Sequence, residues 1–482
     1  MVNRVLSVTS ECFPLIKTGG LADVAGALPI ALEEQGFDVH TLLPGFPAVL
    51  KTTKSRKTLC VLPDFFGGSA KLMSAKSVNG LKLFLLDAPH LYGDDGNPYQ
   101  DTAGKDRANN HIRFAALSYA AAKLATGALT NWHADIVHAH DWQAGLTALY
   151  LSLENGKKPK TVFTIHNLAF QGLFPSTELA ALKIPKACFS RNGIEYWDKV
   201  SFLKAGIVYS DAVTTVSPSY ADEICSDEGG MGFGGLLFHC GDKLSGILNG
   251  IDTDIWNPET DGALATPYSR NKLAGKAKNK RALQKHFGLK VDNNAPLFCV
   301  ISRLTEQKGL DLLAAAVPHI IGNGAQLIVL GSGETRLEKV FVTAAETHSD
   351  NIGCFIGYDE NLAHQIQGGA DVIFIPSRFE PCGLTQLCAM RYGTLPLVAR
   401  VGGLADTVID ANEMALQLGL GTGLQFSPVT EHALKSAIDR TLRLWGDKKT
   451  WRRLQKNAMN LDVSWRGPAA SYAALYRRIA VK

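Results

Sequence analysis

The chain lacks a strong excess of either charge, and it lacks an apolar run long enough to cross a membrane. Its 49 lysines and arginines stand against 45 aspartates and glutamates, a net charge of +4 over 482 residues. So small a surplus does not favour nucleic acid or a membrane surface as a partner. No apolar run approaches the ~20 residues that span a bilayer. Any anion must therefore be bound by a local group of residues.

Paired cysteines are also missing. The nine cysteines are scattered singly, their number is odd, and no C-x-x-C pair occurs. This pattern does not describe a disulfide framework and is typical of a reducing compartment. The first residues, MVNRVLSVTSECFP, lack the apolar stretch and cleavage site of a signal peptide. We therefore expect a soluble, cytoplasmic protein.

What the sequence does contain is a repeated pattern of strands and helices. Hydrophobic residues make up 46% of the chain and charged residues 20%, the composition of a globular protein, and the chain is too long for one core. Short β-branched runs alternate with helical patterns, which predicts α/β domains built on parallel sheets. The expected strands of the first half lie in RVLSVTS, FDVHTLL, LKLFLLD, DIVHAHD, TVFTIHN, AVTTVSP and LSGILNG. Those of the second half lie in PLFCVISR, AQLIVLGSG, IGCFIGY, DVIFIPS and LPLVARVGG.

Two doubly wound domains follow from this pattern. The polar segment from Asp252 to Asn294, rich in proline and lysine, separates them, and we expect it to supply connection and surface rather than a sheet. The last stretch, LDVSWRGPAASYAALYRRIAV, has the apolar spacing of an amphipathic helix after a break at Gly467-Pro468. That helix could pack back across the first domain.

A lysine precedes paired glycines in KTGGLAD, and GGLAD returns at Gly402–Asp406. Paired glycines let the backbone approach a ligand closely, and the N–H groups of the helix that follows point toward an anion. Lys17, beside Gly19 and Gly20, would add a positive charge, although a solvated lysine before an ordinary turn explains this stretch equally well. Each copy follows a strand-like run, so we expect both at the carboxyl edge of a sheet, where α/β domains bind ligands.

Two cations and a carboxylate follow strand-like runs in the second half. In ISRLTEQKGLDLL, Arg303 and Lys308 precede a helix, where cations are unfavourable unless an anion is present, so the pair indicates a diphosphate site. In IPSRFEPCGLTQL, Glu380 precedes the free N–H groups of the next helix. A carboxylate there either complements the helix dipole or accepts hydrogen bonds from sugar hydroxyls, and the second reading suggests a nucleotide sugar. We interpret Cys382 as a pocket wall, since no nearby histidine would activate its thiol.

Polar residues also end two strand-like runs of the first half, in DIVHAHDWQAG and TIHNLAFQG. Alternation places His138 and His140 on one side of their strand. No third ligand stands at a recognised spacing, and we predict no metal site. Asp141 and His166 lie just past the strand ends, where they either meet a substrate or cap the following turn.

Two further patterns each have two possible interpretations. GIDTD, at Gly250–Asp254, matches the Asp-x-Asp pattern of metal-dependent sugar transferases, but its place at the domain junction favours a turn. Tyr99, Trp142, Phe170 and Trp197 are candidates to line a carbohydrate path by stacking, although large aromatic side chains more often belong to a core.

Taken together, these motifs resemble one family. KTGGLADVAGALP, HAHDWQAG, TIHNLAFQG, VLSVTSE, SRLTEQKGLD, SRFEPCGLTQL and VGGLADTV are similar, over essentially the whole chain, to the bacterial glycogen synthases and plant starch synthases. The resemblance implies an α/β fold of the GT-B type, two Rossmann-like domains facing across a cleft. It implies retaining transfer of glucose from ADP-glucose to the non-reducing end of glycogen or another α-1,4-glucan, with no metal or other cofactor.

The resemblance also assigns roles by position. Arg303 and Lys308 would hold the diphosphate, Glu380 the glucose hydroxyls, and these three with His166 would be catalytic. The remaining substrate contacts would come from Glu11, Lys17, Gly19, Gly20, Asp23, Tyr99, Asp141, Asn249, Tyr358, Cys382, Gly383, Leu384 and Thr385. Among these, Tyr358 would cover the adenine and Thr385 would reach a phosphate. The implied domains are residues 1–249 on the acceptor side, 250–457 around the donor, and a crossing helix over 458–482.

One departure from the family pattern is Val401, which precedes the second GGLAD where threonine is common. Three other readings remain: an epimerase of nucleotide sugars, a glycogen-binding protein without catalysis, and a phosphorylase that uses pyridoxal phosphate. The intact set of Lys17, Arg303, Lys308 and Glu380 argues against the binding protein. The residues fit ADP-glucose and UDP-glucose equally, and ADP follows from the resemblance alone.

Overall fold

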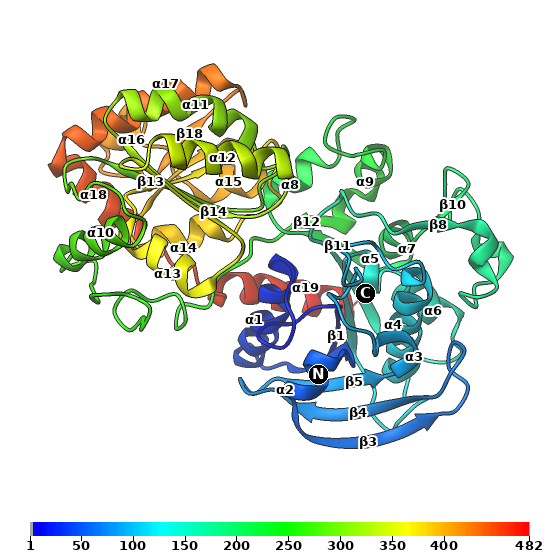
Figure 1. The fold of residues 1–482 in the computed structure, drawn as a ribbon. Helices are drawn as coiled ribbons and strands as arrows, with labels where there is room; N and C mark the ends of the chain where they lie inside the picture. The colour runs from blue at the N-terminus through cyan, green and yellow to red at the C-terminus, as the bar shows by residue number, and fades with distance from the viewer. Residues whose placement is uncertain (1–2, 482) are drawn as a thin grey trace. The chain divides into compact units, whose positions relative to one another are not determined.

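The computed structural model describes residues 3–481. The chain divides into two compact units (Figure 1). Unit 1 comprises Met1–Asn249 together with Trp465–Lys482, and unit 2 comprises Gly250–Ser464. Within the described residues, no helix is both long enough and apolar enough to cross a membrane.

Unit 1 is built on a nine-stranded sheet. Seven neighbouring strands are parallel, and a hairpin extends them at one edge, where β4 is antiparallel to both β5 and β3. In spatial order the strands are β12 (Leu244–Gly246), β11 (Ala212–Thr215), β7 (Lys160–Ile165), β6 (Ile136–His140), β1 (Arg4–Val8), β2 (Asp38–Pro44), β5 (Lys82–Asp87), β4 (Ala70–Lys76) and β3 (Lys54–Leu62). The seven parallel strands are those expected from the sequence, and the β3–β4 hairpin was not predicted.

A small antiparallel sheet and the helices complete unit 1. The small sheet has the order β8 (Leu173–Pro175), β10 (Lys199–Ser201) and β9 (Glu195–Tyr196). The helices are α1 (Gly20–Glu34), α2 (Pro47–Thr52), α3 (Pro89–Tyr92), α4 (Asn110–Ala125), α5 (Asp141–Ala144), α6 (Thr147–Leu153), α7 (Phe202–Tyr209), α8 (Pro218–Glu223), α9 (Gly234–Cys240) and α19 (Arg466–Val481), with short 3-10 turns at Ser176–Leu179, Lys186–Cys188 and Gly241–Lys243.

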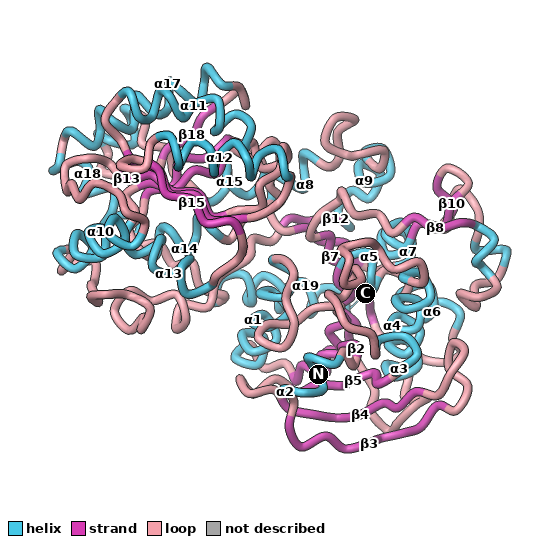
Figure 2. The backbone as a smooth tube through the Cα atoms, viewed as in Figure 1, coloured by secondary structure: helices cyan, strands magenta, loops and turns pink. Residues whose placement is uncertain are grey.

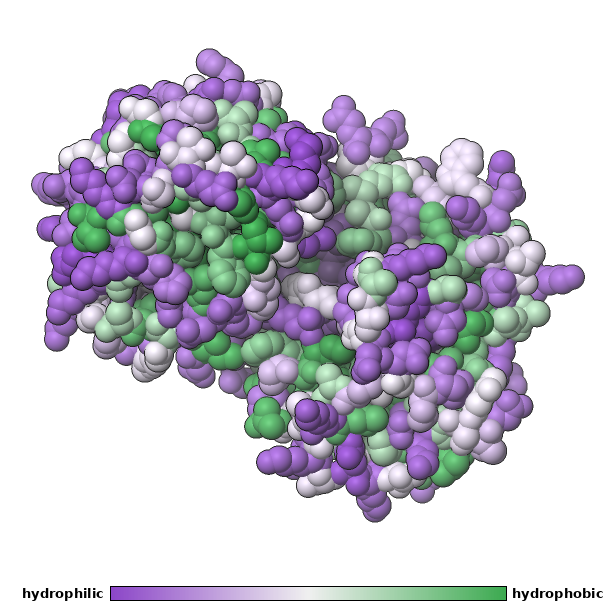
Figure 3. Space-filling view, viewed as in Figure 1, coloured by the Kyte–Doolittle hydropathy of each residue, from purple (hydrophilic) through white to green (hydrophobic). Residues whose placement is uncertain are grey.

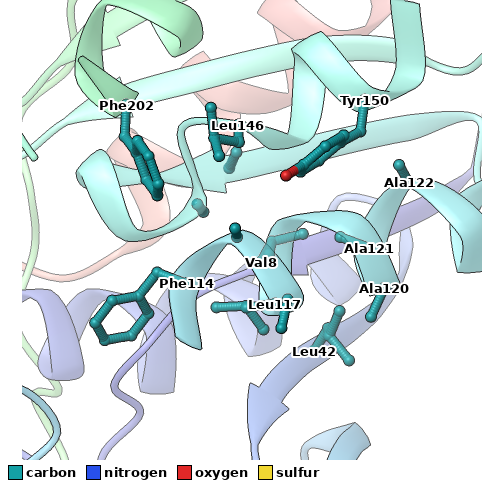
Figure 4. Close-up of a cluster of buried hydrophobic side chains, with 14 of the residues drawn as sticks. Val8, Leu42, Phe114, Leu117, Ala120, Ala121, Ala122, Leu146, Tyr150 and Phe202 are labelled. Carbon is teal, nitrogen blue, oxygen red and sulfur yellow. The ribbon is translucent and has the colours of Figure 1, made fainter. Parts of the chain in front are cut away.

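The main core of unit 1 lies around α4, whose sequence AALSYAAAKLA is rich in alanine. Alanine is the best helix former, and its small side chain lets neighbouring elements approach closely. Figure 4 shows Ala120, Ala121 and Ala122 of α4 among larger apolar side chains, including Leu42 from β2 and Tyr150 from α6. This packing fixes the sheet on which the first group of site residues depends.

The C-terminal helix α19 completes a second core of unit 1. It packs beside α1 (Figure 1), and its Tyr472 and Tyr476 are buried with apolar residues of the sheet. The element begins later than the expected residue 458, because α18 continues through Ala458 and Val463 is still buried in the core of unit 2. The junction therefore lies between Ser464 and Trp465.

Unit 2 has a six-stranded, fully parallel sheet. Its spatial order is β15 (Ile352–Ile356), β14 (Gln326–Gly331), β13 (Leu297–Ile301), β16 (Val372–Ile375), β17 (Leu395–Ala399) and β18 (Leu424–Phe426). In chain order this is 3-2-1-4-5-6, the arrangement of dinucleotide-binding domains. The short strand β18 was not predicted.

Helices cover both faces of this sheet (Figure 2). They are α10 (Ala274–His286), α11 (Leu310–Gly322), α12 (Thr335–Thr347), α13 (Glu360–Gly369), α14 (Thr385–Arg391), α15 (Gly402–Thr407), α16 (Glu413–Gln417), α17 (Glu431–Gly446) and α18 (Lys448–Ala458). The two faces have separate apolar clusters, one under α11 and α17 and the other under α10 and α13.

The segment from Asp252 to Asn294 contains no strand, as expected, but its assignment to the surface was wrong for one face of α10. Lys276 and Lys280 are almost fully buried. The Lys280 ammonium pairs with Asp371 at 2.7 Å, and that of Lys276 donates to Thr394 Oγ1 at 2.6 Å. Buried cations are tolerated only with such partners, and the sequence alone does not reveal them.

Polar side chains dominate the visible surface of each unit, with apolar residues scattered among them (Figure 3). Single exposed apolar side chains are normal on a folded protein.

Candidate active site

The order of strands reverses at one point in each parallel sheet, and the predicted residues follow the strands at those points. In unit 1 the reversal lies between β1 and β6, and in unit 2 between β13 and β16. Ligands of open α/β sheets bind beyond the carboxyl ends of such strands. Glu11 follows β1 and Asp141 follows β6, while Arg303 follows β13 and Glu380 follows β16. The topology thus gives each unit a ligand-binding edge.

Glu11 organises the loop that carries the first glycine pair. Its buried carboxylate accepts hydrogen bonds from Thr18 Oγ1 at 2.6 Å, from the Gly19 N–H at 3.1 Å and from the Thr18 N–H. The Tyr99 hydroxyl also donates to it. With both oxygens bound to the chain itself, Glu11 acts in this structure as the residue that orients the Lys17–Gly20 loop.

The other predicted residues of this loop lie at the surface. Lys17 Nζ pairs with Asp23 Oδ1 at 2.8 Å, and both side chains are partly exposed. Gly19 precedes the first residue of α1 with φ −155°, a conformation open to any residue, and a Cβ built on it meets nothing within 4 Å. Nothing in unit 1 therefore requires glycine at this position, which leaves close approach of an external group as the physical reason for it.

Asp141 and His166 lie together beside this loop. The Asp141 carboxylate accepts the His166 N–H at 2.7 Å and the Asn167 N–H at 3.4 Å. Burial raises the pKa of Asp141 to about 7, more than those two N–H groups lower it, and the charge of Glu11 raises it further. Asp141 also has φ +56°, an uncommon conformation that aspartate tolerates better than most residues.

Three histidines stand next to Asp141. His140 Nδ1 lies 3.0 Å from His166 Nε2, and the rings of His138 and His140 are 4.0 Å apart, which confirms that both point to the same side of β6. Burial lowers the pKa of His138 and of His166 to about 3, so both rings are neutral at physiological pH.

Both ring nitrogens of His138 and of His140 already have partners. His138 contacts the Tyr476 hydroxyl at 2.7 Å and Thr164 Oγ1 at 2.6 Å, while His140 contacts Ser7 Oγ at 3.3 Å in addition to His166. Within residues 3–481, no group of three or more histidine, cysteine, aspartate or glutamate side chains has the arrangement of a metal site. The GIDTD segment forms a turn, in which Asp252 Oδ1 accepts the Asp254 N–H at 2.9 Å.

Asn249, at the end of unit 1, is buried, yet its Oδ1 has no hydrogen-bond partner among residues 3–481. A buried polar atom without a partner is costly, which favours a ligand or water as the missing donor. Of the predicted residues, Asn249 therefore carries the most direct sign of an absent partner.

In unit 2 the central interaction is an ion pair. Lys308 Nζ and Glu380 Oε2 are 2.6 Å apart, and Ser377 Oγ donates to the same oxygen at 2.9 Å. Gly309 lets the two loops meet: it has φ +68°, and a Cβ there would lie 1.9 Å from the carbonyl oxygen of Pro376. The structure thus brings together Lys308 and Glu380, which lie 72 positions apart in the sequence.

The loop after Glu380 is held by the second GGLAD. The Gly403 N–H donates to the carbonyls of Glu380 and Pro381, and a Cβ on Gly403 would lie 2.4 Å from the backbone of Cys382. Gly383 has φ +72°, and α14 begins at Thr385, so the N–H groups at this helix start are available to an anion. The two GGLAD copies both begin helices at a carboxyl edge, as predicted, but an added Cβ would overlap the chain at Gly403 and would meet nothing within 4 Å at Gly19.

Two predicted residues of unit 2 lie apart from this pair. Arg303 is exposed at the end of β13, and Tyr358 is exposed after β15, where its hydroxyl donates to Glu360. Both lie at the same carboxyl edge as Lys308 and Glu380.

Sequence reasoning missed three residues that hold these loops in place. Thr18 binds Glu11, Ser377 binds Glu380, and the Gln386 amide donates to the carbonyls of Cys382 and Gly383, each at 2.9 Å. Each of them stands inside a motif that had been singled out for its glycines or its charges. The sequence could have indicated them, because each is a hydroxyl or amide side chain close to a charged residue or a glycine turn.

Comparisons with known proteins agree with this architecture. Residues 4–239 match the family model described as "Starch synthase catalytic domain", and residues 283–460 match "Glycosyl transferases group 1". A glycogen synthase of Rhodopseudomonas palustris strain TIE-1 is 55% identical over 478 residues, covering 99% of both chains. One from Methylocella silvestris is 54% identical over 473 residues, covering 98% of both.

Among solved structures, the catalytic domain of Starch Synthase IV from Arabidopsis thaliana, bound to ADP and acarbose, superposes with a TM-score of 0.91 at 32% identity over the full length of both chains. A sucrose-phosphate synthase from Thermosynechococcus elongatus, 17% identical and covering 99% of both chains, has a TM-score of 0.61 and supports the fold alone. The predicted GT-B fold class, with its two doubly wound α/β domains, is confirmed. The chain belongs to the glycogen and starch synthase family of glycosyltransferases.

Proposed function

We propose that this chain is a glycogen synthase that transfers glucose from ADP-glucose to the non-reducing end of an α-1,4-glucan, with retention of configuration and release of ADP. The proposal is supported by relatives that are more than half identical and carry that name. It is also supported by the structural neighbour that binds ADP together with acarbose.

The donor would bind mainly at the carboxyl edge of unit 2. A lysine ammonium has three N–H donors, and the bond from Lys308 to Glu380 uses one of them. The other two, with the exposed guanidinium of Arg303, suit a diphosphate and would stabilise the charge that grows on it as it leaves. The N–H groups around Cys382, Gly383 and Leu384, and the Thr385 hydroxyl, would complete this anion site.

Glu380 would orient the glucose that is transferred. Lys308 and Ser377 both bind its Oε2, which leaves Oε1 to accept a hydrogen bond from a sugar hydroxyl. The ion pair thus links the group that holds the sugar to the group that holds the diphosphate. Tyr358, exposed at the same edge, would cover the adenine.

Asp141, His166 and Asn249 would contact the sugar from unit 1. Because His166 is neutral, it would contribute a hydrogen bond rather than a proton. The free Oδ1 of Asn249 would accept a hydrogen bond from a sugar hydroxyl. In the loop held by Glu11, Lys17 and the glycine pair would contact a phosphate or sugar, with Gly19 allowing close approach.

The chemistry would need no side-chain nucleophile. On the retained face, an oxygen of the leaving diphosphate accepts the proton of the attacking glucan hydroxyl while the bond from glucose C1 to that diphosphate breaks and the new C1–O bond forms. The protein contributes position and positive charge, and each of these lowers the barrier to such a transfer. We expect no metal or other cofactor.

The observation that carries this proposal is the Lys308–Glu380 ion pair. The pair lies at the point where the strand order of unit 2 reverses, and the relatives of the chain are glycogen synthases. The test is incorporation of labelled glucose into glycogen from ADP-glucose and, in parallel, UDP-glucose, with EDTA present. Primer-dependent incorporation from ADP-glucose is the expected result. Incorporation from UDP-glucose alone would overturn the donor, loss of activity in EDTA would overturn the metal-free reaction, and no incorporation from either donor would overturn the transfer itself.

A further inference from the structure

The four aromatic residues considered for a carbohydrate path separate into two kinds. Trp142 packs against Phe114 and other core rings, and the Tyr99 hydroxyl is bound to Glu11, so both serve the structure of unit 1. Phe170 and Trp197 are exposed instead, and Trp197 is 81% exposed, the most of any aromatic side chain among the described residues.

Trp197 also has a strained backbone. It and Asp198 form the two-residue turn between β9 and β10, with φ +50° and +59°. Such a turn normally contains asparagine or glycine, because both central residues need positive φ. A bulky residue in this conformation is an outlier, and strain that the fold maintains points to a functional constraint.

The surrounding contacts hold the turn in place without covering the indole. Glu195 Oε1 accepts the Asp198 N–H at 3.0 Å, and the ring of the preceding Tyr196 stacks on Phe233 with centroids 4.3 Å apart. The indole itself meets Tyr196 only at an angle of 81°. A rigid base therefore presents a large aromatic face to solvent.

This turn is continuous with the candidate site. The chain leaves His166, passes the exposed Phe170 and enters β8, whose residues Leu173–Pro175 pair with β10. Gln171 Nε2 and the Tyr196 hydroxyl both donate to the Met231 carbonyl, at 2.9 and 3.4 Å, which ties the connecting segment to the hairpin. Figure 1 shows β8 and β10 standing out beyond α7.

We propose that Trp197 is an anchoring site for the polysaccharide, outside the reaction centre, where the indole stacks on the apolar face of a glucose ring. The negative face of an aromatic ring attracts the C–H groups that a pyranose presents on that side. The proposal rests on the proposed function, since it takes an α-glucan as the partner. A branched polymer held at Trp197 keeps its other chain ends at high effective concentration near the site, whereas maltotriose, a single chain of three glucose residues, has no second chain end to present.

The experiment compares Trp197→Gly with the unaltered chain, using glycogen and maltotriose as primers. Because glycine relieves the strained turn, the variant should be at least as stable to heat. We expect the KM for glycogen to rise by about threefold to tenfold, with kcat and the maltotriose constants unchanged. Trp197→Phe should keep most of the affinity, and Leu418→Ala, which removes a side chain that is 69% exposed in unit 2, should change nothing.

An unchanged KM for glycogen would overturn the proposal, and so would an equal change with both primers. Retardation in a native gel that contains glycogen reads the binding without the reaction. The unaltered chain could transfer no glucose and still be retarded by glycogen, while Trp197→Gly is not retarded. In that case the proposed function is wrong and the anchoring site is supported. Equal retardation of the two proteins would overturn the anchoring site.

Discussion

At the scale of single residues, the Lys308–Glu380 pair is the most direct target. Lys308→Ala and Glu380→Gln should each lower kcat by about a hundredfold to a thousandfold, because a preorganised charge at the reacting bond is lost. Glucan binding, measured by retardation in a glycogen gel, should change far less. Since the two groups are 2.6 Å apart, the double variant should lose much less than the product of the two effects.

A matched control for this pair is the exposed Lys435–Glu431 pair of α17, which has the same 2.6 Å separation. Surface pairs of this kind contribute little to stability and none to a distant reaction. Lys435→Ala should therefore retain full turnover. Near-normal turnover of Lys308→Ala would refute the assigned role.

Replacing one glycine of each GGLAD by serine, Gly19 in the first and Gly403 in the second, gives a second test. Gly19→Ser should leave the melting temperature unchanged, because a Cβ there has open space and serine is a favourable N-cap residue. Its kcat/KM for ADP-glucose should nevertheless fall by about tenfold or more, equivalent to about 1.4 kcal/mol of lost binding to the transition state. Gly403→Ser should destabilise the protein by about 1–3 kcal/mol, because its Cβ would overlap the Cys382 backbone. Full activity of Gly19→Ser would show that no ligand approaches this loop closely.

Asp141 makes stability depend on pH in a predictable direction. Its pKa is raised to about 7 in the folded chain, so between about pH 4 and 7 the folded state binds more protons than the unfolded state, and stability falls as the pH rises. Asp141→Asn keeps an acceptor for the two N–H groups and tolerates the positive φ. It should be more stable than the unaltered chain at pH 8, by up to about 4 kcal/mol.

The difference should fall to about 0.5 kcal/mol by pH 4, where the folded carboxyl is protonated and the unfolded one is about half protonated. Denaturant unfolding of the two proteins at pH 4, 6 and 8 checks this dependence. Parallel curves for the two proteins would contradict it. The variant should lose activity at pH 8, where the sugar contact assigned to Asp141 is made by its carboxylate.

At the scale of secondary-structure elements, α10 is fastened to unit 2 by buried charge. Lys280→Ala would leave the buried Asp371 carboxylate without its paired cation and with the Leu297 N–H as its remaining hydrogen-bond donor. Breaking such a pair by removing one partner costs about 3–5 kcal/mol. Lys278→Ala, on the exposed face of the same helix, should change stability by less than about 0.5 kcal/mol. Equal unfolding midpoints for the two variants in urea would show that the pair does not hold the helix.

Elements differ in how well the sequence predicts them, and burial explains the difference. The central parallel strands are buried on both faces, so their apolar runs are nearly continuous and all were found. The edge strand β3 is largely exposed, so KSRKTLCVL carries no such signal. The three-residue β18 is too short for a pattern. Lysine side chains are usually exposed, so the sequence of α10 does not show that Lys276 and Lys280 are buried against polar partners.

The candidate site shows the same division. Residues that follow central strands were predicted because the topology brings the carboxyl ends of those strands to one edge. The residues that hold them, such as Ser377 and Thr18, act through side-chain contacts that depend on the exact path of each loop. Glu11 was assigned to the substrate by resemblance, whereas in the structure its carboxylate holds the loop of unit 1.

At the scale of the whole molecule, unit 2 is inserted between two parts of unit 1, since the chain leaves unit 1 after Asn249 and returns at Trp465. Composition and motifs predicted two domains and a returning helix. They did not place the second junction, because the helical pattern of α18 continues past residue 457.

This insertion has a consequence for biosynthesis. A ribosome that has finished Asn249 must still make the whole of unit 2 before the helix that closes the core of unit 1 appears. At 5–20 residues per second, synthesis of unit 2 takes roughly 10 to 40 seconds, and throughout that time Val24, Phe37 and the other apolar residues that α19 covers lack their partner. His138 likewise waits for the Tyr476 hydroxyl. The nascent chain therefore exposes an unfinished apolar surface during translation, a natural target for chaperones, and the sixteen residues of α19 complete the fold of unit 1.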